Sequence, residues 1–131
     1  MIIYKTLEEI KKINKANEII IKLYKEVLPK YVKVGVSTYE LDKITEDFIR
    51  SNGAIPGTKG YDIGKPYPPY PASLCASVNN RVVHGIPTKT EILKNGDIIS
   101  LDTVTVLDGF YGDAAITLPV GEIDENAKNN D

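Results

Sequence analysis

The chain has 131 residues, of which 42% are hydrophobic and 26% are charged. This length predicts one domain that can bury a core. The 16 basic and 18 acidic residues give a net charge of -2, so charge provides no reason to expect nucleic acid or a membrane surface as a partner. The sequence lacks an apolar run of transmembrane length and a signal-peptide pattern. A single cysteine, Cys75, excludes an intramolecular disulfide and predicts a reducing, cytoplasmic compartment.

The first half of the sequence predicts two helices. Thr6 and Glu9 form a capping-box pattern, and a helical apolar stripe follows until Pro29, where we expect the helix to end. A second cap begins at Ser37, and Asn52-Gly53 ends the second helix. The apolar stripe of the first helix comprises Leu7, Ile10, Ile13, Ile20, Leu23 and Val27; that of the second comprises Leu41, Ile44 and Phe48.

Residues 53–71 have the composition of a loop, because five of the eight prolines fall there. A loop of this length inside a small domain is often functional, although a plain surface excursion has about even odds. Its tyrosines, Tyr61, Tyr67 and Tyr70, would either line a pocket or pack within the loop.

The second half predicts β structure, which together with the helices indicates an α+β fold with helices covering one face of an antiparallel sheet. One hairpin is expected to join residues 73–78 and 81–84 through Asn79-Asn80. A second joins residues 97–107 and 110–118 through Asp108-Gly109, a strong signal for a two-residue turn.

The second hairpin brings two acidic residues together. If Asp108 and Gly109 form the turn, Val104 lies opposite Asp113 and Asp102 lies opposite Ala115. Asp102 and Asp113 then share a face as diagonal neighbours, with Cβ atoms about 7 Å apart or less. Two carboxylates in the middle of apolar strands raise a pKa or recruit a cation, and hard oxygen ligands suit a divalent metal. The alternative is a solvated face, which spacing alone favours about two to one.

Two further residues carry chemical groups. His84, the only histidine, would be a metal ligand, an acid–base group or a substrate contact, although a lone histidine is more often a structural hydrogen-bonding residue. Cys75 lies between Leu74 and Ala76 in an expected strand, which favours a small buried hydrophobic side chain over a nucleophile.

Four segments carry a family resemblance. They are Ser73-Leu74-Cys75-Ala76-Ser77-Val78-Asn79-Asn80-Arg81-Val82-Val83-His84-Gly85-Ile86-Pro87, Asn95-Gly96-Asp97-Ile98-Ile99-Ser100-Leu101-Asp102, Asp108-Gly109-Phe110-Tyr111-Gly112-Asp113 and Val34-Gly35-Val36-Ser37-Thr38-Tyr39-Glu40-Leu41-Asp42. These segments resemble the type I methionine aminopeptidases. The resemblance covers essentially the whole chain and includes the spacings between His84, Asp102 and Asp113. It implies the N-terminal half of a pita-bread (creatinase/aminopeptidase) fold.

The resemblance also implies a reaction and its residues. These enzymes remove the initiator methionine from nascent polypeptides, using two divalent ions (Co, Mn, Fe or Zn). Asp102 matches a chelating ligand and Asp113 matches the ligand that bridges both ions. His84 matches a residue that assists proton transfer or stabilises the tetrahedral intermediate beside the substrate. Tyr70 and Cys75 match positions lining the methionine pocket, and either Tyr61 or Tyr67 takes the place of a second pocket tyrosine.

The sequence departs from the family pattern in two places. The family uses two Asp, one His and two Glu as ligands, and only the two Asp are matched here, because residues 1–131 correspond to one half of the catalytic domain and the second half is absent. Residues 62–69 resemble an insertion, which would either narrow the pocket or contact the ribosome. We therefore expect weak metal occupancy and weak activity of this chain, which would be a fragment, a split or degenerate protein, or a chain that self-associates through its uncovered face. A fragment or truncated product is favoured.

Two other functions compete with this interpretation. A pita-bread half without activity would serve as a peptide-binding or scaffold module. An α+β domain without any active site is a third, much weaker possibility. Retention of Asp102, Asp113 and His84 argues against the binding module, since a pure binding module gains little from neighbouring like charges. The family resemblance argues against the domain without an active site.

Overall fold

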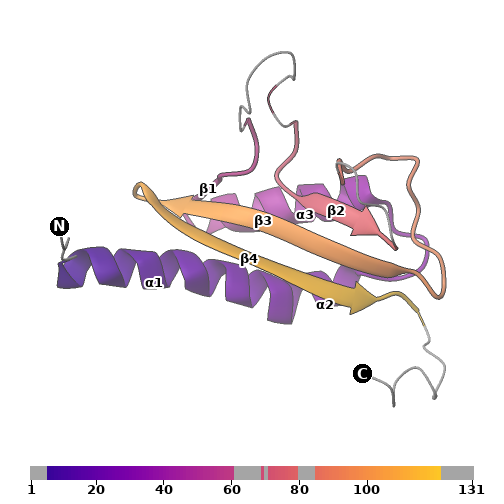
Figure 1. Ribbon diagram of the computed structural model, residues 1–131, viewed down its shortest axis with the longest axis horizontal. Helices are drawn as coiled ribbons and strands as arrows, with labels where there is room; N and C mark the ends of the chain where they lie inside the picture. Colours follow the sequence, from indigo (N-terminus) through magenta and orange to yellow (C-terminus); the bar gives the residue numbers. More distant parts are fainter. Residues whose placement is uncertain (1–5, 61–68, 70, 80–84, 122–131) are drawn as a thin grey trace.

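The protein has helices on one face of a four-stranded antiparallel sheet, as the sequence predicts (Figure 1). The computed structural model describes residues 6–60, 69, 71–79 and 85–121. Within these residues, no helix combines the length and the apolar character needed to cross a membrane.

The first helical segment is longer than predicted and contains a widened turn. Helix α1 (Leu7–Lys22) begins with the expected capping box: the Thr6 hydroxyl accepts from the Glu9 N–H at 3.1 Å, and the Glu9 carboxylate accepts from the Thr6 N–H at 3.3 Å. The prediction that this helix ends at Pro29 is wrong. A π-helical turn, η1 (Leu23–Val27), leads directly into α2 (Leu28–Tyr31), where Pro29 lies in the first turn. The Leu28 N–H, immediately before Pro29, donates to the Leu23 carbonyl five residues back, so the helical segment continues through the π-helical turn and ends at Tyr31.

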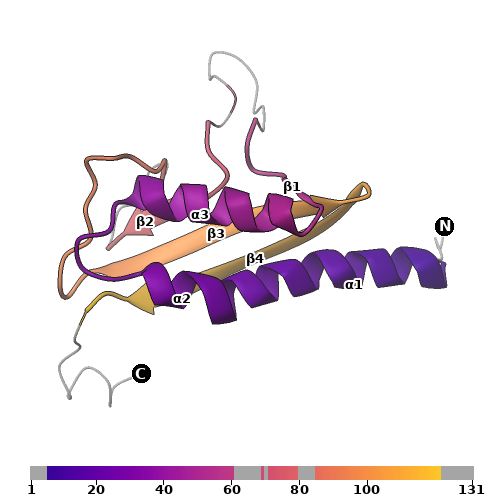
Figure 2. The same ribbon diagram turned by 180° about the vertical axis from the view of Figure 1, so that it is seen from behind.

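The apolar stripe of α1 is buried only in its C-terminal part. Ile20 and Leu23 are almost fully buried, whereas Leu7 is 78% exposed and Ile10 is 42% exposed. Both views show why: the N-terminal end of α1 extends beyond the turn between the two long strands (Figures 1 and 2). The stripe therefore predicted the helix correctly but overestimated how much of it packs on the sheet.

Helix α3 (Thr38–Ser51) has the predicted boundaries. The Ser37 hydroxyl accepts from the Glu40 N–H at 3.1 Å, and Asn52 is the C-cap residue. Gly53 follows with a φ of +79°, a left-handed conformation that glycine adopts without strain. The chain then forms a short strand, β1 (Ile55–Pro56), inside the region that was predicted to be entirely loop.

The sheet is built around its longest pair of strands. β3 (Ile98–Leu107) pairs along one edge with β4 (Phe110–Pro119), and β1 and β2 (Cys75–Val78) pair end to end along its other edge (Figure 1). The predicted return strand at residues 81–84 lies outside the described residues. On that side of β2, the Ala76 N–H donates to the Gly85 carbonyl at 2.7 Å.

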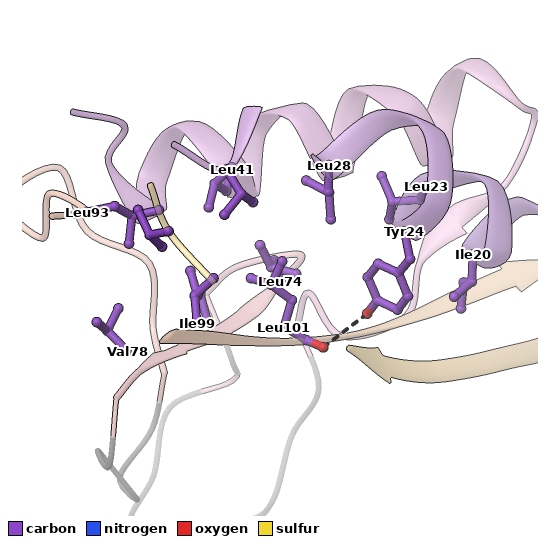
Figure 3. Packing of buried hydrophobic residues seen from close by; sticks show 13 residues of the cluster. Ile20, Leu23, Tyr24, Leu28, Leu41, Leu74, Val78, Leu93, Ile99 and Leu101 are labelled. Carbon is purple, nitrogen blue, oxygen red and sulfur yellow. Dashed lines mark hydrogen bonds between the residues drawn. The ribbon is translucent and has the colours of Figure 1, made fainter. Parts of the chain in front are cut away.

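Helices cover only one face of this sheet. Alternate β3 residues, including Ile99, Leu101 and Leu107, point into the core and are buried. The intervening residues point away from the helices, and Figure 2 shows that the helices all lie on one side. The larger of the two core clusters contains, among others, Ile20, Leu23, Tyr24, Leu28, Leu41, Leu74, Val78, Leu93, Ile99 and Leu101 (Figure 3). We call the uncovered side the open face.

Candidate metal centre

The β3–β4 hairpin forms with the predicted register. Asp108 and Gly109 occupy the turn with φ angles of +50° and +84°, as a two-residue turn with left-handed residues requires. Asp102 lies opposite Ala115, and Asp113 lies opposite Val104. The two aspartates are therefore diagonal neighbours on the open face, which confirms the geometry derived from the sequence.

The two carboxyl groups interact with each other. The pKa of Asp102 is raised, first by partial burial of its carboxyl group, then by the negative charge of Asp113 and by a hydrogen bond between the two side chains; the Thr103 N–H opposes this shift. Both residues are nevertheless exposed, because helices do not cover this face. The two strands are rich in apolar residues, as predicted. The carboxylates themselves, however, lie on an exposed face. Such a pair favours either a shared proton or a bound cation.

The donor chemistry of this pair fits a divalent metal. Two carboxylates on neighbouring rigid strands supply hard oxygen ligands that can face one ion or bridge two. In the part of the chain that the structure describes, no group of three or more His, Cys, Asp or Glu residues could hold a metal. Asp102 and Asp113 would supply two ligands, and a metal site built on them would need further donors.

Cys75 lies beside this pair. It is the residue of β2 directly opposite Asp102 on β3, so its side chain projects to the same open face, where it is half-buried. The prediction that Cys75 is a buried core residue is wrong, because its neighbours Leu74 and Ala76 take the core positions instead. A thiol adjacent to the carboxylates can contact any molecule that reaches Asp102.

Three predicted site residues, Tyr61, Tyr70 and His84, lie outside the described residues. The residues that flank them are described. Gly60 precedes Tyr61, Pro71 follows Tyr70, and Gly85 follows His84. Their assignments to the pocket and to proton transfer stay predictions.

Sequence reasoning missed a tyrosine that lies behind the aspartates. Tyr24, in η1, is buried under the sheet, and its hydroxyl donates to the Ala114 carbonyl at 2.7 Å and contacts the Leu101 carbonyl at 3.4 Å (Figure 3). Burial, followed by the charges of Asp102 and Asp113 among others, raises the pKa of this hydroxyl. A tyrosine within an otherwise apolar helix face was the available signal, since a buried hydroxyl usually has a polar partner.

Comparison with known proteins shows the family. Residues 11–130 match Metallopeptidase family M24. The chain belongs to this family. The methionine aminopeptidase of Clostridium acetobutylicum is 45% identical over 127 residues, which are 97% of this chain and 48% of that protein. Methionine aminopeptidase 1 of Bacillus subtilis is 45% identical over 128 residues, which are 98% and 48% of the two chains.

Solved structures agree with this M24 assignment. The Thermotoga maritima methionine aminopeptidase superimposes with a TM-score of 0.81 at 36% identity, covering 98% of this chain and 49% of that one. A prolidase from Pyrococcus furiosus, at 23% identity and a TM-score of 0.72 over 95% of this chain and 33% of that one, shares the fold. The fold is thus of the pita-bread type, and the M24 chain spans about half the length of the curated relatives it matches.

Proposed function

We propose that this chain carries the carboxylate side of the metal centre of a methionine aminopeptidase, which removes the initiator methionine from nascent polypeptides. The placement of Asp102 and Asp113 as diagonal neighbours on the open face carries the proposal. Membership of a metallopeptidase family and 45% identity to curated methionine aminopeptidases support it.

Each site residue then has a defined task. Asp102 and Asp113 would hold divalent ions, which when bound would supply Lewis-acid chemistry for the scissile carbonyl and for water. His84 moves a proton at the reacting centre or hydrogen-bonds the developing oxyanion. Cys75, together with Tyr70 and either Tyr61 or Tyr67, would contact the methionine side chain, as the family pattern implies for these positions. Of these residues, Cys75 is the one whose position beside Asp102 supports its assignment.

The 131 residues by themselves are expected to be a weak enzyme. Two carboxylates leave a divalent ion under-coordinated, and no histidine other than His84 is available as a further ligand. Additional donors would come from sequence outside these residues or from a second copy that associates through the open face. Co, Mn, Fe and Zn all suit carboxylate–imidazole sites, so the ion that is available decides the occupancy.

The reaction fits a cytoplasmic protein that meets nascent chains, and the single cysteine is consistent with that reducing compartment. The substrate is the N-terminal methionine of a peptide. Residues 62–69, which resemble an insertion in the family pattern, would either narrow the pocket or contact the ribosome. The alternative of a non-catalytic peptide-binding or scaffold module is less well supported, since a pure binding module gains little from the neighbouring like charges of Asp102 and Asp113.

Peptide hydrolysis tests this proposal. The purified chain is incubated with Mn²⁺ and a Met-Ala-Ser peptide, alongside Asp113→Asn and, as a matched charge control in the hairpin turn, Asp108→Asn. We expect slow release of methionine that chelation and Asp113→Asn abolish and that Asp108→Asn retains. Hydrolysis that is equal in Asp113→Asn and the unmodified chain would contradict the proposal.

A further inference from the structure

A segment enters and leaves the sheet beside the aspartate pair. β1 ends at Pro56 and β2 begins at Cys75, and both pair with the same edge of β3. The connecting residues 57–74 therefore depart and return next to Thr103 and Val104, the two residues that follow Asp102.

Both ends of this segment bond to β3. At the start, the Gly57 N–H donates to the Val104 carbonyl at 2.7 Å, and the Val104 N–H donates to the Thr58 hydroxyl at 3.0 Å. At the end, the buried Thr103 hydroxyl donates to the Ser73 carbonyl at 2.6 Å. These bonds tie the segment to the strand that carries Asp102.

Two carboxylates of α3 hold the same ends from the other side. One oxygen of Glu46 accepts from Lys59 Nζ at 2.8 Å and from the Ser73 hydroxyl at 3.0 Å, so it bridges the start and the end of the segment. One oxygen of Asp42 accepts from the backbone N–H groups of Ser73 at 2.7 Å and Leu74 at 2.9 Å. Ser73 and Leu74 are fully buried, so these bonds fix the chain immediately before Cys75.

The arrangement has an electrostatic cost. Asp42 and Glu46 are four residues apart on one helix, where like charges repel. Burial is the larger cause that raises the pKa of Asp42, and the charge of Glu46 adds to it, while the Ser73 and Leu74 N–H groups oppose it. The two carboxylates nevertheless meet at the same buried residue, Ser73, which donates to both.

We infer that Asp42 and Glu46 are positioning residues for substrate recognition. Glu46 fixes the distance between Lys59 and Ser73 at the two ends of the segment. Asp42 fixes the backbone that enters β2, which places Cys75 opposite Asp102. The inference rests on the proposed function for the statement that Cys75 contacts the methionine side chain. The hydrogen bonds from Lys59, Ser73 and Leu74 to Asp42 and Glu46, which we call the clasp, do not depend on the proposed function. Asp42 and Glu46 thus determine how a substrate side chain is held, and they do not alter the positions of the carboxylates of Asp102 and Asp113.

Cys75 is the only cysteine of the chain, so its alkylation by iodoacetamide reports on the clasp directly. We expect Asp42→Ala and Glu46→Ala to accelerate alkylation of the folded protein about fivefold, the factor by which one net hydrogen bond changes a local equilibrium. Asp42→Asn retains an acceptor oxygen and should restore a rate close to that of the unmodified chain. Asp47→Ala, an exposed residue of the same helix, is the matched control.

Two comparisons separate positioning from general loosening. Ile49→Val weakens the core under α3 without touching Ser73, and we expect it to leave the alkylation rate unchanged. With a Met-Ala-Ser peptide and Mn²⁺, Glu46→Ala should raise KM severalfold while kcat stays within about twofold.

The inference is overturned if Asp42→Ala and Glu46→Ala alkylate no faster than Asp47→Ala, or if Ile49→Val alkylates as fast as they do. Absence of peptide hydrolysis in every variant, combined with the expected alkylation rates, would reject the proposed function and leave the clasp established.

Discussion

At the scale of single residues, Glu46 provides a test that depends on pH. Its pKa is lowered to about 2, first by the hydrogen bond from Lys59, with Ser73 and Arg50 adding to the effect. Because the folded-state pKa lies below the ordinary value near 4.5, the ionised carboxylate stabilises the fold above that value. This stabilisation is lost as the pH falls from about 4.5 to about 2.

Glu46→Gln should therefore lower the free energy of unfolding at pH 7 by on the order of 1 kcal/mol, because partial exposure screens the interaction. The difference from the unmodified chain should shrink below pH 4.5 and vanish near pH 2. Removal of the Glu46 charge also relieves the repulsion that raises the pKa of the neighbouring Asp42, which offsets part of the loss at pH 7. Urea unfolding followed by circular dichroism at several pH values measures this difference, and a gap that widens on acidification would refute the assignment.

Tyr24 tests the contact behind the aspartate pair. Tyr24→Phe removes the hydroxyl that donates to the Ala114 carbonyl and changes little else in the core. We expect a loss of about 1 kcal/mol in the free energy of unfolding, the usual net value of such a bond. Tyr31→Phe, at an exposed tyrosine of α2, is the matched control. Equal stability of Tyr24→Phe and the unmodified chain would show that the bond contributes nothing.

At the scale of elements, the contact between α1 and β4 depends on one glycine. A Cβ atom at Gly112 would lie 2.8 Å from the carbonyl oxygen of Ala16, a distance at which backbone must move. Gly112→Ala should therefore destabilise the protein by roughly 1–3 kcal/mol, as overpacking of a close contact does. Ala115→Ser, at an exposed position of β4, should have little effect. Thermal unfolding of both variants tests this prediction. Equal melting temperatures for Gly112→Ala and Ala115→Ser would mean that α1 shifts to accommodate the added methyl group without loss of stability.

The elements also show how far the sequence predicts this fold. Caps at Thr6 and Ser37 and the Asp108-Gly109 turn are local signals, and all three form as expected. The end of the first helix at Pro29 was wrong, since a π-helical turn lets the chain continue. β1 was missed because two residues pair only through β3, which lies some fifty residues later in the sequence.

The same contrast holds for the candidate site. The face shared by Asp102 and Asp113 follows from turn geometry and strand alternation, so it was predictable. The contacts that Tyr24 makes with Ala114, and that Asp42 and Glu46 make with Ser73, were not, because each joins a helix to a residue between 27 and 90 positions away. Residue composition carries no information about which distant backbone group such a side chain will meet.

At the scale of the whole molecule, the described helices cover one face of the sheet, and no described helix covers the other. The open face bears Cys75, Asp102 and Asp113 together with exposed apolar residues, such as Ile98 at 51% exposure and Tyr111 at 66%. A surface that combines carboxylates with exposed apolar side chains is suited to binding a ligand or packing against further protein structure. The functional groups thus lie where further donors can reach them.

The most direct test of the account is calorimetric titration of Mn²⁺ into the unmodified chain, Asp113→Asn and Asp108→Asn, with the fold of each checked by circular dichroism. Both variants remove one carboxylate from the same hairpin, and asparagine keeps the left-handed turn at position 108. The account predicts weak binding that Asp113→Asn abolishes and Asp108→Asn preserves. Binding that survives in Asp113→Asn, or that is lost equally in both variants, would contradict the assignment of Asp102 and Asp113 as metal ligands.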